Sequence, residues 1–417
     1  MRDIRFCHAD RADWLATGPL AAQLDAYKRH LTDGGYAAGT IDRYLAGLAH
    51  LSQWMRRRRI RLQRIDEALV AEFLDDHLPR CRCQAPVVRI RSDVSRALGH
   101  LLVVLRDRGA IAPPAVSQTP VDLELHRYGQ YMTEVRGLAP KTRSIALRIV
   151  GRLLRSRFGD GPIDIAAIKP DHVRRFFAQQ AKLYSKPVYT GSVVASLRGY
   201  FRYRGSLGDT VHALVGAVSY PANWQLASLP KALKPEEIEQ LIRSLGQIGP
   251  SQRRADAIVR CALDLGLRSC EIARLHLDDI DWEAGTVMLR HTKGRRDDVL
   301  PLPATTGKAI AAYLRLERPK TVHRAVFARH VAPREQLVGP DLVRKTIRQA
   351  YARAGLPYTR SHLLRHTMAS RLLAGGSSLK EVADVLRHRS LNTTLIYAKL
   401  DSRSLTEVAL AWPGSAP

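Results

Sequence analysis

The sequence predicts a mostly α-helical fold with one small antiparallel β element, and three observations support this fold class. Apolar residues recur at three- and four-residue spacing through about the first two hundred residues, which is the period of an amphipathic helix. The one clear β pattern is the segment 285–290, followed by a polar turn and the apolar segment 298–302. At 417 residues, 45% of them hydrophobic, the chain is long enough for about two to four domains with separate cores. We therefore expect helical bundles first and an α+β domain after them.

The amino-terminal half contains a loose internal repeat with an offset of about 102 residues. Four residues of the first copy have a counterpart in the second copy: Tyr27 corresponds to Tyr128, Leu31 to Met132, Gly35 to Gly137, and Thr40 to Thr142. Each copy goes on to a helix that carries a phenylalanine of buried type, Phe73 or Phe176. The repeat predicts two related helical bundles, which we place at residues 1–112 and 118–215.

A third domain is predicted at residues 233–417, after a proline-containing linker at 216–232. The segment Lys234-Pro235-Glu236-Glu237 indicates the start of its first helix, because acidic side chains in the first turn stabilise the positive end of the helix dipole. The two apolar segments named above then predict an antiparallel hairpin, and the turn between them is basic.

The chain is strongly basic, since 66 Lys and Arg residues against 39 Asp and Glu give a formal net charge of +27. A polyanion is therefore the expected partner. A membrane surface is one such polyanion, but the sequence has no run of 18 apolar residues, and its amino terminus carries charges of both signs without the apolar segment of a secretory signal. The sequence thus predicts a cytoplasmic protein that binds nucleic acid and no membrane.

Three groups of basic residues are candidates for contacts with DNA phosphates. The first group is a run at the end of a predicted helix, made up of Arg56, Arg57, Arg58 and Arg59. The second group is Lys141 followed by three arginines on one helix face, Arg148, Arg152 and Arg155. The third group is a pair four residues apart, Arg198 and Arg202. A solvated helix surface is the alternative interpretation of each group.

Cysteine usage predicts reduced thiols and no metal site. The five cysteines are odd in number and form no regular framework, which is typical of a reducing compartment. His77, Cys81 and Cys83 would offer three metal ligands, but no second Cys or His pair follows at the spacing of a zinc finger. We accordingly expect no metal, and the lack of a glycine-rich phosphate-binding loop predicts no nucleotide cofactor.

The third domain carries a set of basic, histidine and tyrosine residues in a fixed order. They are Arg268 and Glu271 within 266–272, Lys293 in the hairpin turn, His362, Arg365 and His366 within 361–367, His388, and Tyr397 nine residues later. This order and spacing resemble the tyrosine recombinase family, also called the phage integrase family, whose signature is Arg, Lys, His-x-x-Arg, His or Trp, and Tyr. Each residue type alone is common in an arginine-rich chain, so the complete set carries the resemblance.

Phosphodiester chemistry gives these residue types matching roles. Cleavage without a metal requires a nucleophile, cationic donors for the two non-bridging oxygens, and an acid for the leaving 5′ oxygen. Tyr397 is the candidate nucleophile. Arg268 and Arg365 are the candidate clamp, because a guanidinium keeps its charge and presents two N–H groups to a phosphate. His362 is the candidate base that takes the phenol proton.

Two further residues complete the predicted chemistry. Lys293, on the hairpin turn, is the candidate acid for the 5′ oxygen, and His388 is the candidate donor to a non-bridging oxygen. A solvated charge is the alternative for Lys293, and a core aromatic is the alternative for Tyr397.

Two residues are predicted to support the others. Glu271 lies three residues after Arg268 and is expected to orient that arginine or to support His362 by a hydrogen bond. His366 is interpreted either as a second phosphate donor or as a buried histidine bonded to the backbone.

The resemblance implies a site-specific DNA recombinase or integrase, with helical DNA-binding bundles and an α+β tyrosine recombinase catalytic domain. Tyr397 would form a 3′-phosphotyrosyl link that a partner strand's hydroxyl reverses, without metal or other cofactor. The implied partner is double-stranded DNA in a bacterial cytoplasm, bound by a tetramer on two sites or by a hetero-assembly with sister recombinases. The apolar strip at 405–412 is suited to docking on a neighbouring protomer.

The doubled helical region resembles the transposon-borne branch of the family, which would make integration or transposition of a mobile element the biological role. Two alternatives share parts of this pattern. A type IB topoisomerase-like enzyme would use the same chemistry to relax DNA as a monomer. A non-catalytic DNA-binding accessory factor would be expected to have lost at least one catalytic position, and none is lost.

Overall fold

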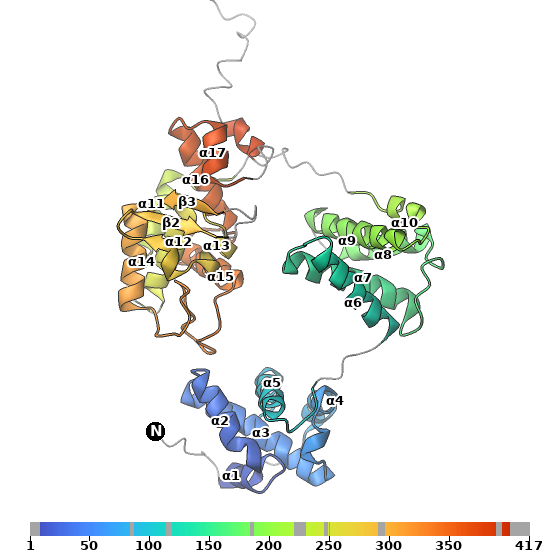
Figure 1. The fold of residues 1–417 in the computed structure, drawn as a ribbon. Coiled ribbons are helices and arrows are strands. Elements are labelled where there is room, and N and C mark those ends of the chain that lie inside the picture. The colour runs from blue at the N-terminus through green and yellow to red at the C-terminus, as the bar shows by residue number, and fades with distance from the viewer. Residues whose placement is uncertain are drawn as a thin grey trace, which may run out of the picture. The chain divides into compact units, whose positions relative to one another are not determined.

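The computed structural model describes residues 9–83, 87–113, 119–183, 187–220, 231–245, 249, 251–290, 297–388 and 394–400. Lys293, most of the predicted linker and the apolar strip at 405–412 lie outside these residues. The described chain is mostly helical and contains one three-stranded antiparallel sheet (Figure 1). The predicted fold class is therefore confirmed. None of the described helices is both long enough and apolar enough to cross a membrane.

Backbone contacts divide the chain into two compact units, one of residues 114–227 and the other of residues 1–113 together with 228–417. Buried apolar side chains form three large clusters and one small one. They lie within residues 14–111, 121–218, 233–364 and 369–397. The division into three domains at the boundaries given above stays a prediction.

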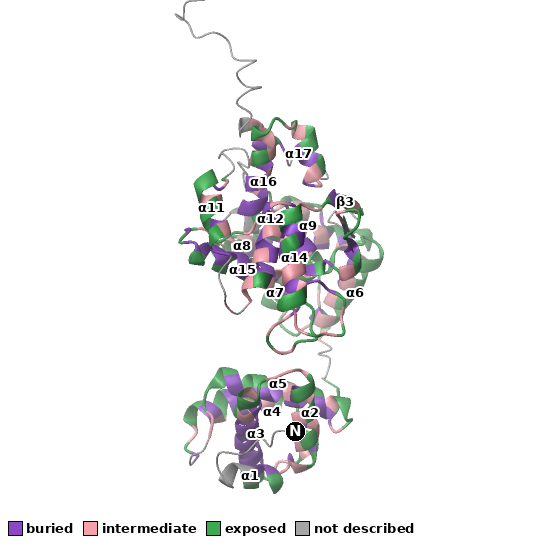
Figure 2. Ribbon diagram, turned by 90° about the vertical axis from the view of Figure 1, so that its left-hand side faces the viewer, coloured by how far each residue is buried: buried purple, intermediate pink, exposed green. Residues whose placement is uncertain are grey.

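The first bundle is built around one long helix. Its helices are α1 (Ala9–Ala16), α2 (Leu24–Asp33), α3 (Ala38–Arg58), α4 (Glu67–Glu72) and α5 (Arg91–Asp107), with the 3-10 helices η1 (Ala21–Gln23), η2 (Leu62–Arg64) and η4 (Leu78–Arg80) and the π-helical turn η3 (Phe73–His77). In α3 every residue from Tyr44 to Met55 is buried, and Figure 2 shows this helix buried along most of its length. A helix that is buried on all sides needs neighbours on all sides, so α3 forms the centre of this bundle.

The second bundle is also built from α-helices. It consists of α6 (Pro120–Glu134), α7 (Pro140–Phe158), α8 (Pro170–Lys182), α9 (Pro187–Ser206) and the short α10 (His212–Gly216). Tyr27 and Tyr128, which the repeat pairs, are both buried, and so are Phe73 and Phe176. The repeated aromatic positions are therefore core positions in both copies.

The third region contains the remaining helices. They are α11 (Pro235–Arg243), α12 (Gln252–Leu263), α13 (Ser269–Arg274), α14 (Ala304–Leu316), α15 (Pro340–Arg353), α16 (His362–Ala374) and α17 (Leu379–Val385), with the 3-10 helices η5 (Leu277–Asp279) and η7 (Leu395–Leu400). Helix α11 begins at Pro235 as predicted, and the Glu237 carboxylate caps it by accepting from the Lys234 N–H at 2.8 Å. Helix α12 packs against α13, α14, α15 and α16, so one buried helix contacts the segments that carry Arg268, His362 and Arg365.

The predicted hairpin is present. Strand β2 (Thr286–Leu289) pairs antiparallel with β3 (Asp298–Pro301), and β1 (Ile280–Asp281) adds a third strand on the other side of β2. The sequence did not predict β1, because two residues are too few to show an alternating pattern.

Candidate active site

The turn before Arg268 determines how closely three segments approach. Gly266 has a φ of +57°, in the left-handed region that glycine adopts without strain. A Cβ at this position would lie 2.6 Å from Met368 Sδ and 3.0 Å from Leu386 Cδ2. The missing side chain therefore lets α16 and the end of α17 pack directly on this turn.

Glu271 joins two arginines in this region. Its carboxylate accepts from the Arg268 backbone N–H at 2.8 Å and from the Arg268 guanidinium at 2.7 Å, while the Arg387 guanidinium donates to it at 3.0 Å. The side chains of Glu271 and Arg387 are only 6% and 4% exposed. Burial alone would raise the pKa of Glu271, but the charge of Arg387 and the hydrogen bonds from Arg268 bring this pKa below its ordinary value. Glu271 is thus an ionised carboxylate that fixes the direction of both guanidiniums.

Arg365, in the first turns of α16, is 4% exposed. Its guanidinium donates to the carbonyl oxygens of Gly266 and Leu386. Burial and the nearby charges of Arg268 and Arg387 lower the pKa of Arg365 to about 9. This value is still above neutral pH, so the side chain keeps its positive charge. Two backbone carbonyls hold the group in place without neutralising it.

Tyr397, in η7, is 1% exposed, and its hydroxyl lies 2.6 Å from Nδ1 of His366. Burial raises the pKa of this phenol to about 12, although the charge of Arg365 acts in the opposite direction. Burial also lowers the pKa of His366, and the charges of His362 and Arg365 lower it further. A neutral imidazole therefore lies within hydrogen-bonding distance of a protonated phenol.

The two histidines of the family signature lie at the ends of their segments. His362 is the first residue of α16, and the preceding Ser361 hydroxyl lies 3.0 Å from the hydroxyl of Ser269 at the start of α13. Nδ1 of His388 lies 2.7 Å from the hydroxyl of Thr394. Burial and the charges of Arg365 and Arg268 lower the pKa of His388 to about 4, so this ring is neutral at pH 7.

Two contacts in this site bear on the roles of its residues. The sequence predicts His362 as the base, whereas the imidazole at the Tyr397 hydroxyl is that of His366, one helical turn further along α16. Arg387 was not singled out, because one more arginine carries no signal in an arginine-rich chain. Its buried contact with Glu271 makes it part of the same charge cluster. The cluster contains three guanidiniums, of Arg268, Arg365 and Arg387, and one carboxylate, and this excess of positive charge favours an anionic ligand.

The arginine run of the first bundle lies at the end of α3, and all four side chains are exposed. Arg56 donates to the Thr17 hydroxyl at 3.2 Å, and Arg57 lies 3.9 Å from Cys83 Sγ. Arg58 lies over the Trp54 ring and pairs with Glu72 at 2.5 Å. Arg59 has a left-handed backbone at φ +55° that ends the helix. Intramolecular contacts thus engage the first three members of the run.

The basic residues predicted on α7 are all exposed. They are Lys141, Arg148, Arg152 and Arg155. Arg152 donates to the Gln180 side chain of α8 at 3.3 Å, and Arg155 pairs with Asp122 of α6 at 2.5 Å. Since Asp122 already balances one charge, we expect Arg155 to contribute less than Lys141 and Arg148 to an anionic surface.

The pair predicted on α9 differs in exposure. Arg202 is exposed, whereas Arg198 is half-buried with its guanidinium 5.8 Å from the centre of the Tyr220 ring. Arg202 and Tyr220 also line a common pocket with residues of α6 and α7. Of this pair, Arg202 is therefore the better placed for a contact with an external phosphate.

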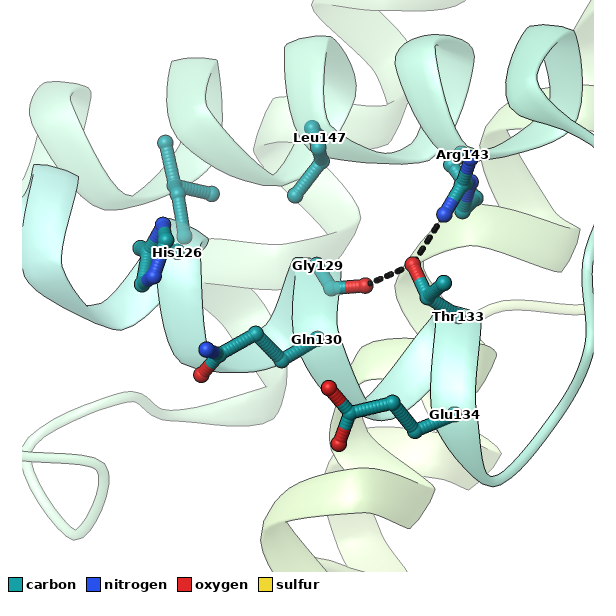
Figure 3. Close-up of a pocket in the computed structure, with 8 residues that line it drawn as sticks. His126, Gly129, Gln130, Thr133, Glu134, Arg143 and Leu147 are labelled. Atoms are coloured by element: carbon teal, nitrogen blue, oxygen red, sulfur yellow. Dashed lines mark hydrogen bonds between the residues drawn. The ribbon is translucent and has the colours of Figure 1, made fainter.

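Another pocket lies between α6 and α7 (Figure 3). It is lined by Leu125, His126, Gly129, Gln130, Thr133, Glu134, Arg143 and Leu147. Arg143 and Thr133 point toward one another, and the arginine donates to the hydroxyl, which donates in turn to the Gly129 carbonyl at 2.8 Å. None of the predicted catalytic or DNA-binding residues lines this pocket, so we assign it no part in the chemistry.

Comparison with known proteins agrees with this geometry. The model of the phage integrase family matches residues 231–403, which include all the predicted catalytic positions. The putative integrase/recombinase y4rA of Sinorhizobium fredii is 36% identical over 405 residues, which cover 96% of this chain and 96% of the relative. The chain belongs to the phage integrase family. It is a site-specific recombinase of the tyrosine type.

Other members of the family match a shorter part of this recombinase. Tyrosine recombinase XerC of Rhizobium meliloti is 30% identical over 312 residues, covering 70% of this chain and 94% of XerC. Among solved structures, the XerH recombinase bound to a palindromic difH substrate matches with a TM-score of 0.53 at 17% identity, over 70% of this chain and 96% of that one. This structural match shows the shared fold.

Proposed function

We propose that this recombinase cuts and rejoins double-stranded DNA through a 3′-phosphotyrosyl intermediate on Tyr397. The proposed biological role is the integration or transposition of a mobile element. The main support is the 2.6 Å contact between the Tyr397 hydroxyl and His366, within the domain in which Arg268, Arg365 and Arg387 provide an anion site. The printed description of y4rA, putative integrase/recombinase, supports the role in integration.

Attack requires a deprotonated phenol. A phenol with a pKa of about 12 is almost fully protonated at neutral pH, so its proton must leave as the O–P bond forms. His366 Nδ1 is within reach to accept that proton. In the proposed step the Tyr397 oxygen bonds to phosphorus, the bond from phosphorus to the 5′ oxygen breaks, and the phenol proton moves to His366.

The phosphate itself is held by the charge cluster. As the pentavalent state forms, negative charge builds up on the two non-bridging oxygens, and Arg268 and Arg365 stabilise it with fixed N–H donors. His388 adds a neutral donor: if the Thr394 hydroxyl donates to Nδ1, the ring proton is on Nε2. Arg387 acts through Glu271, because both of these side chains are buried.

The leaving 5′ oxygen needs a proton, and we propose Lys293 as its donor, as expected from the sequence. The reverse reaction uses the same groups in the opposite order. A 5′ hydroxyl from the partner strand attacks phosphorus, the bond to Tyr397 breaks, and His366 returns the proton to the phenol. No net bond energy is lost, so no energy-supplying cofactor is required.

Exchange between two DNA sites requires four protomers, and we propose a tetramer of this chain or an assembly with sister recombinases. Lys141, Arg148 and Arg202 are the exposed side chains of the second bundle that we propose for phosphate contacts. The solved XerH complex with its palindromic difH substrate supports duplex DNA as the ligand. We propose that the helical bundles and the catalytic domain act as three DNA-contacting modules in the bacterial cytoplasm.

The experiment begins with selection of bound duplexes from a random pool by the full chain. Two copies of the selected sequence are then placed on one plasmid, and the purified protein is added. We expect deletion or inversion of the intervening DNA with wild type and none with Tyr397→Phe. Relaxation of a one-site plasmid without strand exchange would favour a topoisomerase, and binding without any covalent attachment would favour an accessory factor.

A further inference from the structure

The first bundle contains a cluster of two histidines and two cysteines whose donor atoms converge on one point. His50 lies in α3, His77 ends the π-helical turn η3, and Cys81 and Cys83 follow η4. One ring nitrogen of each histidine and the two sulfurs all lie within 4.8 Å of one another. The side chains of His50 and Cys83 are buried, and those of His77 and Cys81 are half-buried.

The spacing of these atoms matches a tetrahedral metal site. Zinc binds nitrogen at about 2.05 Å and sulfur at about 2.3 Å, so tetrahedral angles place two nitrogens about 3.3 Å apart and a nitrogen and a sulfur about 3.6 Å apart. Nε2 of His50 and Nε2 of His77 lie 3.2 Å apart. Cys81 Sγ is 3.2 Å from His50 Nε2, and Cys83 Sγ is 3.7 Å from His77 Nε2. Three of the six donor separations are thus close to those that a metal ion would require, and all six are within 4.8 Å.

The surroundings hold one histidine in the protonation form that a metal needs. Nδ1 of His50 lies 3.1 Å from the carbonyl oxygen of Val88, which can only accept, so Nδ1 carries the proton and Nε2 presents its lone pair to the cluster. The Phe73 ring packs edge-on to His50 and is stacked with His77, with ring centres 5.1 and 5.2 Å apart. These contacts fix both imidazole planes.

Hydrogen bonds alone account for the cluster poorly. The lone pair of His50 Nε2 is a single acceptor, yet both His77 Nε2 and Cys81 Sγ lie 3.2 Å from it. Only one of them can donate to it along the lone-pair direction. A metal ion between the four atoms would be bound by all four donors at once.

We propose that His50, His77, Cys81 and Cys83 bind one zinc ion in a closed tetrahedral site. Two sulfur and two nitrogen donors in this arrangement are typical of zinc. Binding releases two protons to solvent, one from each thiol, and the two thiolates balance the charge of the ion. The guanidinium of Arg57 lies 3.9 Å from Cys83 Sγ, and that of Arg89 donates to the Cys83 carbonyl at 2.8 Å, so both cations lie beside the site.

The zinc ion would have a structural role. It joins the buried helix α3 to the segment after η3, and His50 is only six residues before Arg56, where the arginine run begins. Zinc would thereby fix the end of α3 that carries this run. The proposal is independent of the recombination chemistry, since none of the four ligands belongs to the catalytic set.

The test uses the full untagged chain, expressed in medium containing zinc and analysed for metals by mass spectrometry. We expect close to one zinc per chain. Exchange with cobalt should give the visible bands of tetrahedral cobalt and a thiolate-to-cobalt charge-transfer band. Wild-type protein without zinc, or with a disulfide between Cys81 and Cys83, or with a cobalt spectrum lacking the thiolate band, would overturn the proposal.

Ligand variants show which residues bind the ion. Cys81→Ser and His50→Gln should lose zinc and lower the melting temperature by at least about 4 °C. Because such variants can unfold, the experiment includes a second kind of variant, Cys83→His. It keeps four donors and should retain zinc while its cobalt charge-transfer band weakens by about half. Two matched controls, His30→Gln in the same bundle and Cys261→Ala elsewhere, should keep zinc at the wild-type level. Equal zinc in wild type and Cys81→Ser would refute the assignment.

Discussion

Replacing His366 by phenylalanine tests which imidazole takes the proton from Tyr397. The substitution keeps a ring of similar size in the half-buried site but removes the nitrogen that lies 2.6 Å from the phenol hydroxyl. The phenol of Tyr397 has a pKa of about 12, so pH 8 lies four units below that pKa. At 1.36 kcal/mol per unit, ionising the phenol before the attack costs about 5.4 kcal/mol. A general base typically contributes about 10²- to 10⁴-fold, so His366→Phe should slow cleavage within that range.

The pH dependence gives the sharper readout. In wild type the proposed base is His366, whose pKa is lowered below its ordinary value of 6.5, so it is already deprotonated above that pH and cleavage should be constant from about pH 7 to 9. In His366→Phe the rate should follow the phenolate fraction and rise tenfold per pH unit across the same range.

The assay is single-turnover cleavage of a substrate whose leaving 5′ oxygen is replaced by sulfur, because a thiolate leaves without a proton and the profile then reports the nucleophile alone. His362→Phe is the matched comparison, in the same helix one turn away. It should keep the flat profile even if its rate falls. A flat profile in His366→Phe, or a tenfold slope in His362→Phe, would refute the assignment of the base to His366.

Three further changes test the surroundings of the site. Glu271→Gln removes the carboxylate between two guanidiniums and should lower the free energy of unfolding by about 3 kcal/mol in denaturant titrations at pH 7. Because the pKa of Glu271 is depressed, this difference between wild type and variant should disappear as the pH falls below that pKa. A difference that persists at low pH would contradict the ion-pair explanation. Gly266→Ala places a Cβ 2.6 Å from Met368 Sδ at a residue with positive φ and should lower the free energy of unfolding by about 2 kcal/mol or more. The measurements are the melting temperature, which should fall, and the cleavage rate, which should be slower. Unchanged values of both would show that the turn is not constrained. The double variant of Lys141→Gln and Arg148→Gln should flatten the dependence of log affinity on log salt by about 1.8, at about 0.9 per phosphate contact. Arg155→Gln, whose charge Asp122 already balances, should leave the slope unchanged. An unchanged slope in the double variant would place Lys141 and Arg148 outside the DNA contact.

The sequence predicted the helical class, the start of α11 at Pro235 and the hairpin of β2 and β3, because each of these depends on local residue patterns. Sequence similarity to known recombinases likewise confirms the family that the residue order indicated. The helical class, the helix start and the hairpin are determined by residues that are close together along the chain, and the family by the order of residues from Arg268 to Tyr397.

Features that depend on tertiary packing could not be predicted in the same way. His362 and His366 lie one turn apart on α16, and the docking of η7 decides which of them reaches Tyr397. Arg387 became recognisable only through its buried contact with Glu271. The fourth donor of the proposed zinc site, His50, precedes His77 by 27 residues and lies on another helix, so spacing around the cysteines gave no sign of it.

The central claim is that Tyr397 becomes covalently bound to the 3′ phosphate of the cut strand. The most direct measurement is to incubate the protein with a selected duplex carrying a nick close to the cleavage position, which lets the short 5′-hydroxyl fragment diffuse away and traps the intermediate. After digestion with protease and nuclease, mass spectrometry should find a nucleotide attached to the peptide containing Tyr397, the attached strand should end in a 3′ link, and Tyr397→Phe should give no adduct. A nucleotide on another residue, or an adduct that persists in Tyr397→Phe, would contradict the account.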